Sequence, residues 1–321
     1  MRMRTWLTDT FGLDVPVVGA PMAGAAAGRL ARAVSEAGAL GCIGVGSAAS
    51  VDWLREQADV ARQSGRPFGI GLMAWVLGDR PELLDAAVSA QPALVSVSYG
   101  DYAPAVELLR EQGIVTATQV GTVEEVLDAD RCGVDVIVAR GAEGGGHGRG
   151  EVATLPLLQE VLDVARRPVL AAGGIATGRG LAAVLAAGAE GAWVGTAFLT
   201  CTEAETTDAA ADLLVAADAT STVYSEVFDR ASRSGWPPHY GGRSLRNRFV
   251  DTWLGREAEV EAEPSVPELL ARARDEQDYD TAVIYAGQAV GMLSGRQTAQ
   301  DVVRELARAD EHLRTAAARL R

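Results

Sequence analysis

Short apolar segments rich in β-branched residues alternate with longer segments rich in Ala and Leu through the first two thirds of the chain. The short segments are nearly continuous in apolar character, as parallel strands covered on both faces are. In the longer segments apolar residues recur at spacings of three and four, which predicts helices. The expected strands are residues 15–20, 40–45, 68–74, 94–99, 114–120, 134–140, 168–172 and 191–198. The expected helices between them are residues 30–37, 53–63, 105–111, 124–130, 157–165 and 181–187.

The spacing of these eight strands favours one architecture. Their midpoints lie roughly 20 to 33 residues apart, about the length that a strand, a helix and two turns need. Eight such units are typical of an α/β TIM barrel, whereas the competing doubly wound open sheet normally has fewer. We therefore predict a (β/α)8 TIM barrel over residues 1–220.

The regular alternation stops after Phe198. One more helix is expected at residues 204–220, followed by a loop rich in turn formers and aromatic residues at 234–242 and an acidic linker at 257–264. Two further helices are expected at 266–276 and 299–320. We therefore predict that residues 221–321 form a lid and linker segment with C-terminal helices, an extension that covers the top of the barrel.

The composition excludes several classes of protein. Hydrophobic residues make up 48% of the chain and charged residues 22%, as in soluble globular proteins, and no stretch approaches the ~18 consecutive apolar residues of a membrane span. The net charge of −14 argues against nucleic acid and anionic membranes as partners. Three scattered Cys predict neither a disulfide framework nor a dedicated metal site. Residues 1–6 lack the apolar core of a signal peptide, so we expect a cytoplasmic protein.

All 29 basic residues are Arg, because the chain contains no Lys. A Lys Schiff base and a Walker-type phosphate loop are therefore both excluded. Any catalytic cation must come from Arg or from one of three His.

Glycines stand at the carboxyl-terminal parts of the last two expected strands: Gly173 and Gly174 follow the seventh, and Gly195 lies within the eighth. In a TIM barrel the loops after strands seven and eight commonly hold a phosphate, and glycines let the backbone N–H groups approach its oxygens. Gly173, Gly174 and Gly195 stand at these positions, and Thr196 can add a hydroxyl donor. They therefore predict a phosphate site that needs no Lys.

The loop after the sixth expected strand carries five glycines among residues 141–148, together with His147 and Glu143. So much glycine costs backbone entropy that packing cannot recover, and taken alone such a run would favour a flexible surface loop. This loop, however, lies at the end of a barrel strand and supplies one imidazole and one carboxylate. An imidazole changes charge near neutrality, so it can orient an anion or remove a carbon-bound proton. We therefore predict that His147 is a functional residue.

With these segments in place, the chain resembles the nitronate monooxygenase family, formerly called 2-nitropropane dioxygenases, which is related to the flavin-dependent enoyl-ACP reductases. The resemblance is carried, in the family's order, by residues 19–24 (GAPMAG), 139–147 (ARGAEGGGH), 171–175 (AAGGI), 194–198 (VGTAF) and 285–288 (YAGQ). It covers the chain from about residue 12 to residue 293.

The resemblance implies a TIM barrel that holds FMN non-covalently, with the phosphate on Gly173, Gly174, Gly195 and Thr196. It places Ala20, Pro21 and Met22 along the isoalloxazine, Gly145 in the cofactor-binding set, and His147 as the catalytic residue. Family members oxidise nitronates with O2 to a carbonyl compound and nitrite, so the implied partners are a small-molecule substrate and O2. The flavin carries the redox chemistry and the protein positions it.

The chain departs from the family pattern at several positions. Gly71 stands where relatives often have Asn, and Tyr285 replaces a frequent Trp. Because Lys is absent, Gln119 and Arg140 are the substitutes near the ring, and only Arg140 could carry charge toward a reduced flavin. These departures leave the substrate open.

Two other enzymatic interpretations remain at this point. One is an FMN-dependent NAD(P)H reductase of quinones or enoyl thioesters on the same scaffold. The other is a flavin-free barrel lyase or isomerase that binds a phosphorylated substrate in the same glycine cradle. The sequence also leaves open whether the chain forms a homodimer.

Overall fold

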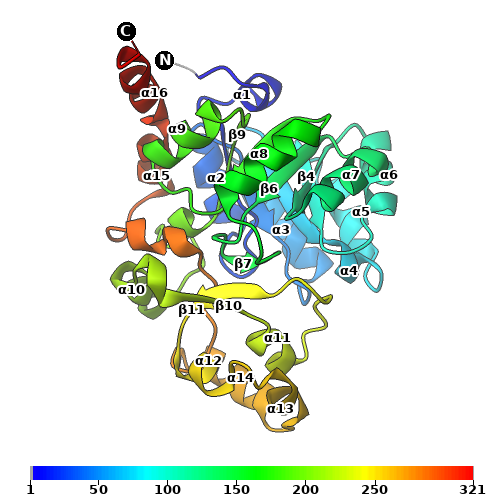
Figure 1. The fold of residues 1–321 in the computed structure, drawn as a ribbon. Helices are drawn as coiled ribbons and strands as arrows, with labels where there is room; N and C mark the ends of the chain where they lie inside the picture. Colours follow the sequence, from blue (N-terminus) through cyan, green and yellow to red (C-terminus); the bar gives the residue numbers. More distant parts are fainter. Residues whose placement is uncertain (1–2, 321) are drawn as a thin grey trace.

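Eight parallel strands form the centre of the molecule in the computed structural model, which describes residues 3–320 (Figure 1). Met1 and Arg2 of the amino-terminal segment lie outside the described residues. The strands follow one another in the order β1-β9-β8-β6-β5-β4-β3-β2, and a bridge between Val18 and Leu40 joins the two ends of this order. The sheet is therefore a TIM barrel, as predicted. Its strands are β1 (Val17–Gly19), β2 (Gly41–Gly44), β3 (Phe68–Met73), β4 (Leu94–Ser98), β5 (Val115–Val120), β6 (Val136–Arg140), β8 (Val169–Ala172) and β9 (Gly191–Val194).

All eight expected strands are confirmed, but the last is shorter than expected. It ends at Val194, and residues Thr196–Phe198 form the 3-10 helix η1. Gly195 and Thr196 therefore lie just beyond the strand, in the loop at the carboxyl end, instead of within it.

Helices surround the barrel, and each of the six helices expected between the strands is present. Two more, α4 and α5, lie in the third unit, where the spacing pattern indicated none. The helices of this layer are α2 (Gly28–Glu36), α3 (Val51–Arg62), α4 (Ala74–Leu77), α5 (Glu82–Ser89), α6 (Ala103–Glu111), α7 (Val123–Cys132), α8 (Thr154–Val164) and α9 (Gly178–Ala186).

The barrel interior is a packed apolar core. Alternate residues of the strands fill it, including Val18, Cys42, Val138 and Trp193, all at most 3% exposed. Helix α1 (Trp6–Phe11) adds Leu7 to the same core, at the amino ends of the strands. With that end plugged, only the carboxyl end is left to host a site.

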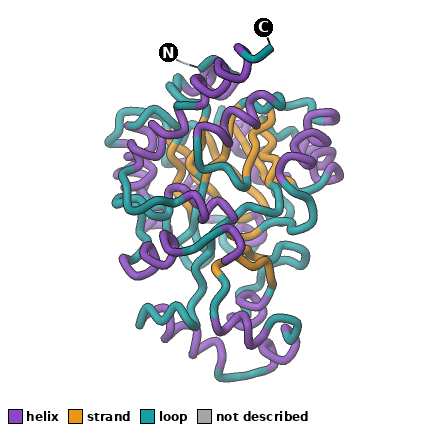
Figure 2. The backbone as a smooth tube through the Cα atoms, turned by 60° about the vertical axis from the view of Figure 1, so that its left-hand side comes forward, coloured by secondary structure: helices purple, strands orange, loops and turns teal. Residues whose placement is uncertain are grey.

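The segment from residue 222 to residue 286, here called the cap, lies at the carboxyl end of the barrel (Figures 1 and 2). Its sheet joins β10 (Thr222–Ser225) and β11 (Gly242–Leu245) to β7 (Gly146–His147), which belongs to the loop after β6. The cap has its own apolar cluster, which includes Phe228, Phe249 and Leu270. Its helices are α11 (Val227–Ser232), α12 (Arg248–Trp253), α13 (Glu257–Ala262) and α14 (Val266–Asp275).

The cap differs from the sequence expectation in its local structure. The acidic residues 257–264 were expected to be a linker, but most of them form α13, because Val260 is fully buried against the rest of the cap. The loop expected around residues 234–242 is confirmed up to the start of β11. The helix expected at 204–220 is the shorter α10 (Asp208–Ala216).

The last helices do not lie over the top of the barrel. The single helix expected at 299–320 is broken at Arg308 into α15 (Ala299–Ala307) and α16 (Ala309–Ala318). Their apolar residues, such as Val302 and Leu306, join the cluster between the strands and α9, so the two helices flank the barrel (Figure 1). The extension that covers the carboxyl end is therefore the cap alone. Within residues 3–320 no helix is long and apolar enough to cross a bilayer.

Candidate active site

His147 lies where the barrel meets the cap. It is the second residue of β7, and its backbone is paired with Gly242 of β11. Its side chain is only 9% exposed. Nε2 lies 2.8 Å from Oδ1 of Asp229, a residue of α11, and because a carboxylate only accepts, Nε2 carries the hydrogen.

Aromatic rings enclose this imidazole. The ring of Trp236 stacks on it with centroids 3.5 Å apart and planes 6° apart, and the ring of Tyr285 lies at 5.0 Å. Tyr99, which follows β4, donates from its hydroxyl to the carbonyl oxygen of His147 at 3.0 Å. Trp75 and Tyr99 also contact Trp236, at 5.5 and 5.1 Å between centroids. The imidazole is therefore fixed in position and shielded from water.

Burial raises the pKa of the Tyr99 hydroxyl, and the charge of Arg140 and a hydrogen bond with Gln119 only partly oppose this. Burial also raises the pKa of Tyr285, and the nearby carboxylate of Asp229 raises it further. Both phenols are therefore neutral hydrogen-bond donors around neutral pH.

Arg140, at the end of β6, is 4% exposed. Its Nη2 lies within hydrogen-bond distance of the carbonyl oxygens of Gly144 (2.8 Å), Gly145 (3.1 Å) and Gly146 (2.9 Å), and Nη1 donates to the carbonyl of Arg149 at 3.2 Å. Burial lowers its pKa below that of a free guanidinium. The sequence suggested that Arg140 faces a flavin; in the structure its Nη donors hold together the loop that carries the imidazole.

Glu143 also has a local role. Its Oε2 accepts from the backbone N–H and the hydroxyl of Thr154, both at 2.8 Å. Thr154 is the first residue of α8, whose N-cap residue makes no side-chain hydrogen bond. A carboxylate at this end satisfies free N–H groups and complements the helix dipole. Glu143 thus fixes the start of the glycine loop to α8.

The glycine cradle predicted for a phosphate is present at the carboxyl ends of β8 and β9. Gly173 and Gly174 both have positive φ, +105° and +69°. A Cβ on Gly173 would lie 2.7 Å from the hydroxyl of Thr154, whereas one on Gly174 would have no neighbour closer than 3.7 Å. The backbone at Gly174 therefore has room for a small group beside it, next to the side chain of Glu143. The residues present here fit the phosphate of FMN.

Thr196 stands beside this cradle and is 8% exposed. Its hydroxyl oxygen accepts from the backbone N–H of Gly287 at 2.9 Å. The hydroxyl hydrogen is thus left to donate, as the predicted phosphate contact requires.

The end of β1 forms a second wall of the site. Ala20 donates its backbone N–H to Val194, so residues 20–22 run beside the end of β9. A Cβ on Gly195 would lie 3.3 Å from the sulfur of Met22. A Cβ on Gly71 would overlap the ring of Pro21. The ring of Pro21 therefore occupies the space that any side chain at position 71 would need.

Close packing of two backbones requires a glycine at position 145. A Cβ there would overlap the backbone N of Gly287, so the glycine loop and residues 286–287 approach as bare backbones. Its predicted contact with the cofactor stays a prediction, as do those of Gln119 and Arg140.

The sequence did not identify Asp229 or assign a role to Trp236. Asp229 lies 82 residues from its partner His147 and belongs to no motif. Trp236 stood in the aromatic loop recognised as unusual, which was the only signal for it. Both reach the imidazole because β11 pairs with β7.

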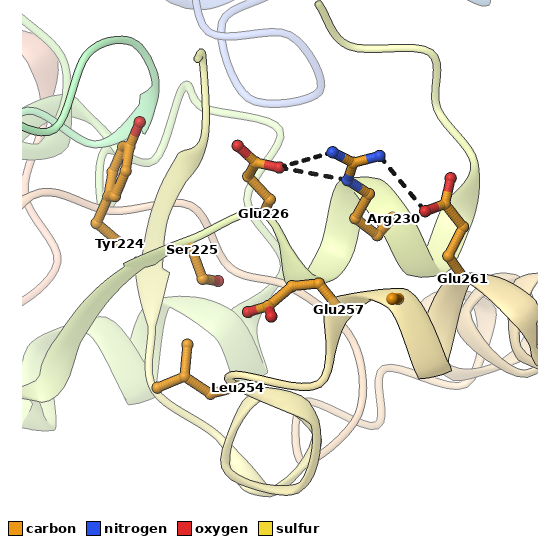
Figure 3. Close-up of a pocket in the computed structure, with 8 residues that line it drawn as sticks. Tyr224, Ser225, Glu226, Arg230, Leu254, Glu257 and Glu261 are labelled. Carbon is orange, nitrogen blue, oxygen red and sulfur yellow. Dashed lines mark hydrogen bonds and ion pairs between the residues drawn. The ribbon is translucent and has the colours of Figure 1, made fainter. Parts of the chain in front are cut away.

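A separate pocket of about 510 Å3 lies within the cap (Figure 3). Its lining includes Glu226, Glu257 and Glu261, with Arg230 between the first and the last of these at 3.2 and 3.4 Å. It does not include His147 or the glycine cradle, so we do not place the active site there.

Solved structures share the fold of this chain. FabK from Thermotoga maritima superposes with a TM-score of 0.84 at 28% identity, covering 99% of this chain and 98% of its own. The nitroalkane oxidase from Streptomyces ansochromogenes superposes with a TM-score of 0.80 at 30% identity, covering 97% of this chain and 99% of its own.

Curated relatives agree as well. Rv1533 of Mycobacterium tuberculosis, provisionally named a monooxygenase, is 38% identical over 242 residues, which are 70% of this chain and 60% of that protein. A Staphylococcus aureus JH9 protein, provisionally named a nitronate monooxygenase, is 28% identical over 314 residues, covering 84% of this chain and 85% of its own. The model of the family described as "Nitronate monooxygenase" matches residues 4–87 and 78–309. This chain belongs to the nitronate monooxygenase family.

Proposed function

We propose that this protein is an FMN-dependent oxidoreductase that oxidises alkyl nitronates with O2 to a carbonyl compound and nitrite. The observation that carries the proposal is the buried, fixed imidazole of His147 at the same end of the barrel as the glycine cradle. FMN, held there by Gly173, Gly174, Gly195 and Thr196, would supply the electron transfer that no side chain can perform. The family membership and the similarity to a nitroalkane oxidase support the same assignment.

The protein's own residues have three tasks in this reaction. His147 is the acid–base group: Asp229 keeps one hydrogen on Nε2, so Nδ1 can take up a proton and, once protonated, donate Nδ1–H to an oxygen of the nitronate. The ring of Trp236 and the hydroxyl of Tyr99 keep the imidazole and its strand in place. The cap excludes water, which strengthens the hydrogen bond to the substrate anion.

A second candidate is the reductase of quinones or enoyl thioesters. It is favoured by the similarity to FabK, an enoyl-ACP reductase, over nearly the whole of both chains. The same cradle and the same imidazole would serve this reaction, with NAD(P)H as the reductant. The two proposals differ in which molecule reduces the flavin.

The test is a visible spectrum of the purified protein followed by anaerobic titration. A yellow protein with a flavin spectrum is expected, and a colourless one that does not take up FMN would instead indicate the flavin-free lyase or isomerase. Prompt bleaching by an alkyl nitronate, without bleaching by NADH or NADPH, supports the monooxygenase. Prompt bleaching by NAD(P)H alone would replace it with the reductase.

A further inference from the structure

We propose that Asp229 is a positioning residue for catalysis, a carboxylate supplied by the cap that fixes the tautomer of His147 and leaves Nδ1 as the reacting nitrogen. The inference rests on the proposed role of His147. It adds a residue that lies outside the glycine loop and the strand ends, on an element that the sequence did not connect with the site.

The contact has the features of a built interaction. Oδ1 of Asp229 lies 2.8 Å from Nε2 of His147, and the two side chains are 12% and 9% exposed. A second donor, the hydroxyl of Ser234, reaches the same carboxylate oxygen at 3.3 Å. The carboxylate is therefore held in place within the cap by Ser234 and is not a mobile surface group.

The imidazole has little freedom to make another arrangement. Its planar stack on Trp236 fixes the ring plane, and the pairing of His147 with Gly242 fixes its backbone. Within this plane one edge of the ring, with Nε2, faces Asp229. None of the hydrogen bonds in residues 3–320 uses Nδ1, so this nitrogen is available to a bound molecule.

The chemical consequence concerns both protonation states. In the neutral ring, Asp229 holds the hydrogen on Nε2, so the lone pair lies on Nδ1. When Nδ1 takes up a proton, the carboxylate stabilises the imidazolium charge that forms, in the same way as the third member of a catalytic triad orients its histidine. Without Asp229 the ring can carry its hydrogen on either nitrogen, and the fraction in the reactive form falls.

The first test measures the tautomer directly and needs no turnover. In protein labelled with 15N at histidine, the signals of His147 are assigned by their loss in a His147→Gln variant. At a pH where the ring is neutral, the wild type should show a protonated Nε2 and an unprotonated Nδ1. Asp229→Asn should move the ring toward the other tautomer, because an amide can also donate, and Asp229→Glu should restore the wild-type pattern. A wild-type ring protonated on Nδ1, or an Asp229→Asn spectrum identical to wild type, would overturn the proposal.

The second test separates positioning from general structure. Asp229→Asn should lower kcat on the order of 10- to 100-fold with KM changed less than about threefold, a smaller loss than the ~100- to 10,000-fold of a missing acid–base group. Asp251→Asn is the matched control, because Asp251 is also a cap carboxylate but forms an exposed ion pair with Arg246. It should leave the tautomer and kcat unchanged. Equal losses in the two variants would mean that Asp229 acts only on the stability of the cap.

The outcomes also distinguish this inference from the proposed function. If the wild type does not oxidise nitronates but the tautomer depends on Asp229, the positioning role stands and the substrate assignment fails. If nitronates are oxidised and neither tautomer nor kcat responds to Asp229→Asn, the function stands and the positioning role fails.

Discussion

Arg140 offers a quantitative test of how the loop that carries the imidazole is held. The change Arg140→Met keeps an unbranched apolar stem but removes the guanidinium and with it every donor. Four carbonyl oxygens, those of Gly144, Gly145, Gly146 and Arg149, then lose their guanidinium partner. Because a buried polar group left unpaired costs ~1–3 kcal/mol, and water can reach part of this loop, we expect about two full penalties.

The expected loss is thus about 2–6 kcal/mol of unfolding free energy, a large share of the ~5–15 kcal/mol typical of a whole protein. The assay is urea unfolding of the FMN-free protein, followed by far-UV circular dichroism. Arg304→Met is the matched control, because Arg304 forms an exposed ion pair with Asp301, and it should stay within about 0.5 kcal/mol of wild type.

Two results would refute this reasoning. An Arg140→Met variant within about 1 kcal/mol of the control would mean that the loop does not depend on the guanidinium. A variant of normal stability that no longer retains FMN would mean that Arg140 acts on the cofactor, as its position in the sequence first suggested.

Three further predictions concern the site and the core. Replacing His147 by Asn should leave FMN bound but reduce turnover ~100- to 10,000-fold in a steady-state assay, and unchanged turnover would contradict its role. Replacing Gly174 by Val should lower the flavin-to-protein absorbance ratio, because φ is +69° and the side chain would enter the space left for the phosphate; full occupancy would argue against the cradle. Burial raises the pKa of Cys42, and raises that of Cys201 to about 12, so both stay protonated in the fold. A thiol reagent at pH 8 should therefore modify only the partly exposed Cys132 in the folded protein, and all three thiols after unfolding. Above pH ~9 the unfolded chain releases thiol protons that the folded protein retains, so the free energy of unfolding should fall as the pH rises.

The barrel was predictable from the sequence because its strands are covered on both faces. The first four residues of β6, Val136 to Ala139, are accordingly all apolar and buried, and the long helices between strands show their spacing clearly. The glycine cradle was predictable for a similar reason, since its position after β8 and β9 follows from the order of the strands. These features depend on local patterns repeated at regular intervals.

The cap was not predictable in the same way. Helix α13 buries only one residue, Val260, so its acidic sequence looks like a linker until the cap is folded. The pairing of Asp229 with His147 depends on register between β11 and β7, which no local pattern encodes. The break at Arg308 between α15 and α16 likewise interrupts a periodicity that reads as one helix.

Strand β7, which carries His147, is shared between the barrel and the cap. It belongs to the loop that follows β6, and it is also the edge strand of the cap sheet, where His147 pairs with Gly242 of β11. The backbone of His147 thus belongs to the barrel loop, whereas the hydrogen-bond partner and the stacking partner of its ring, Asp229 and Trp236, both belong to the cap. The reactive ring is therefore assembled by two parts of the chain, and a substitution that loosens the cap is expected to disturb the imidazole even where it touches neither the ring nor the barrel.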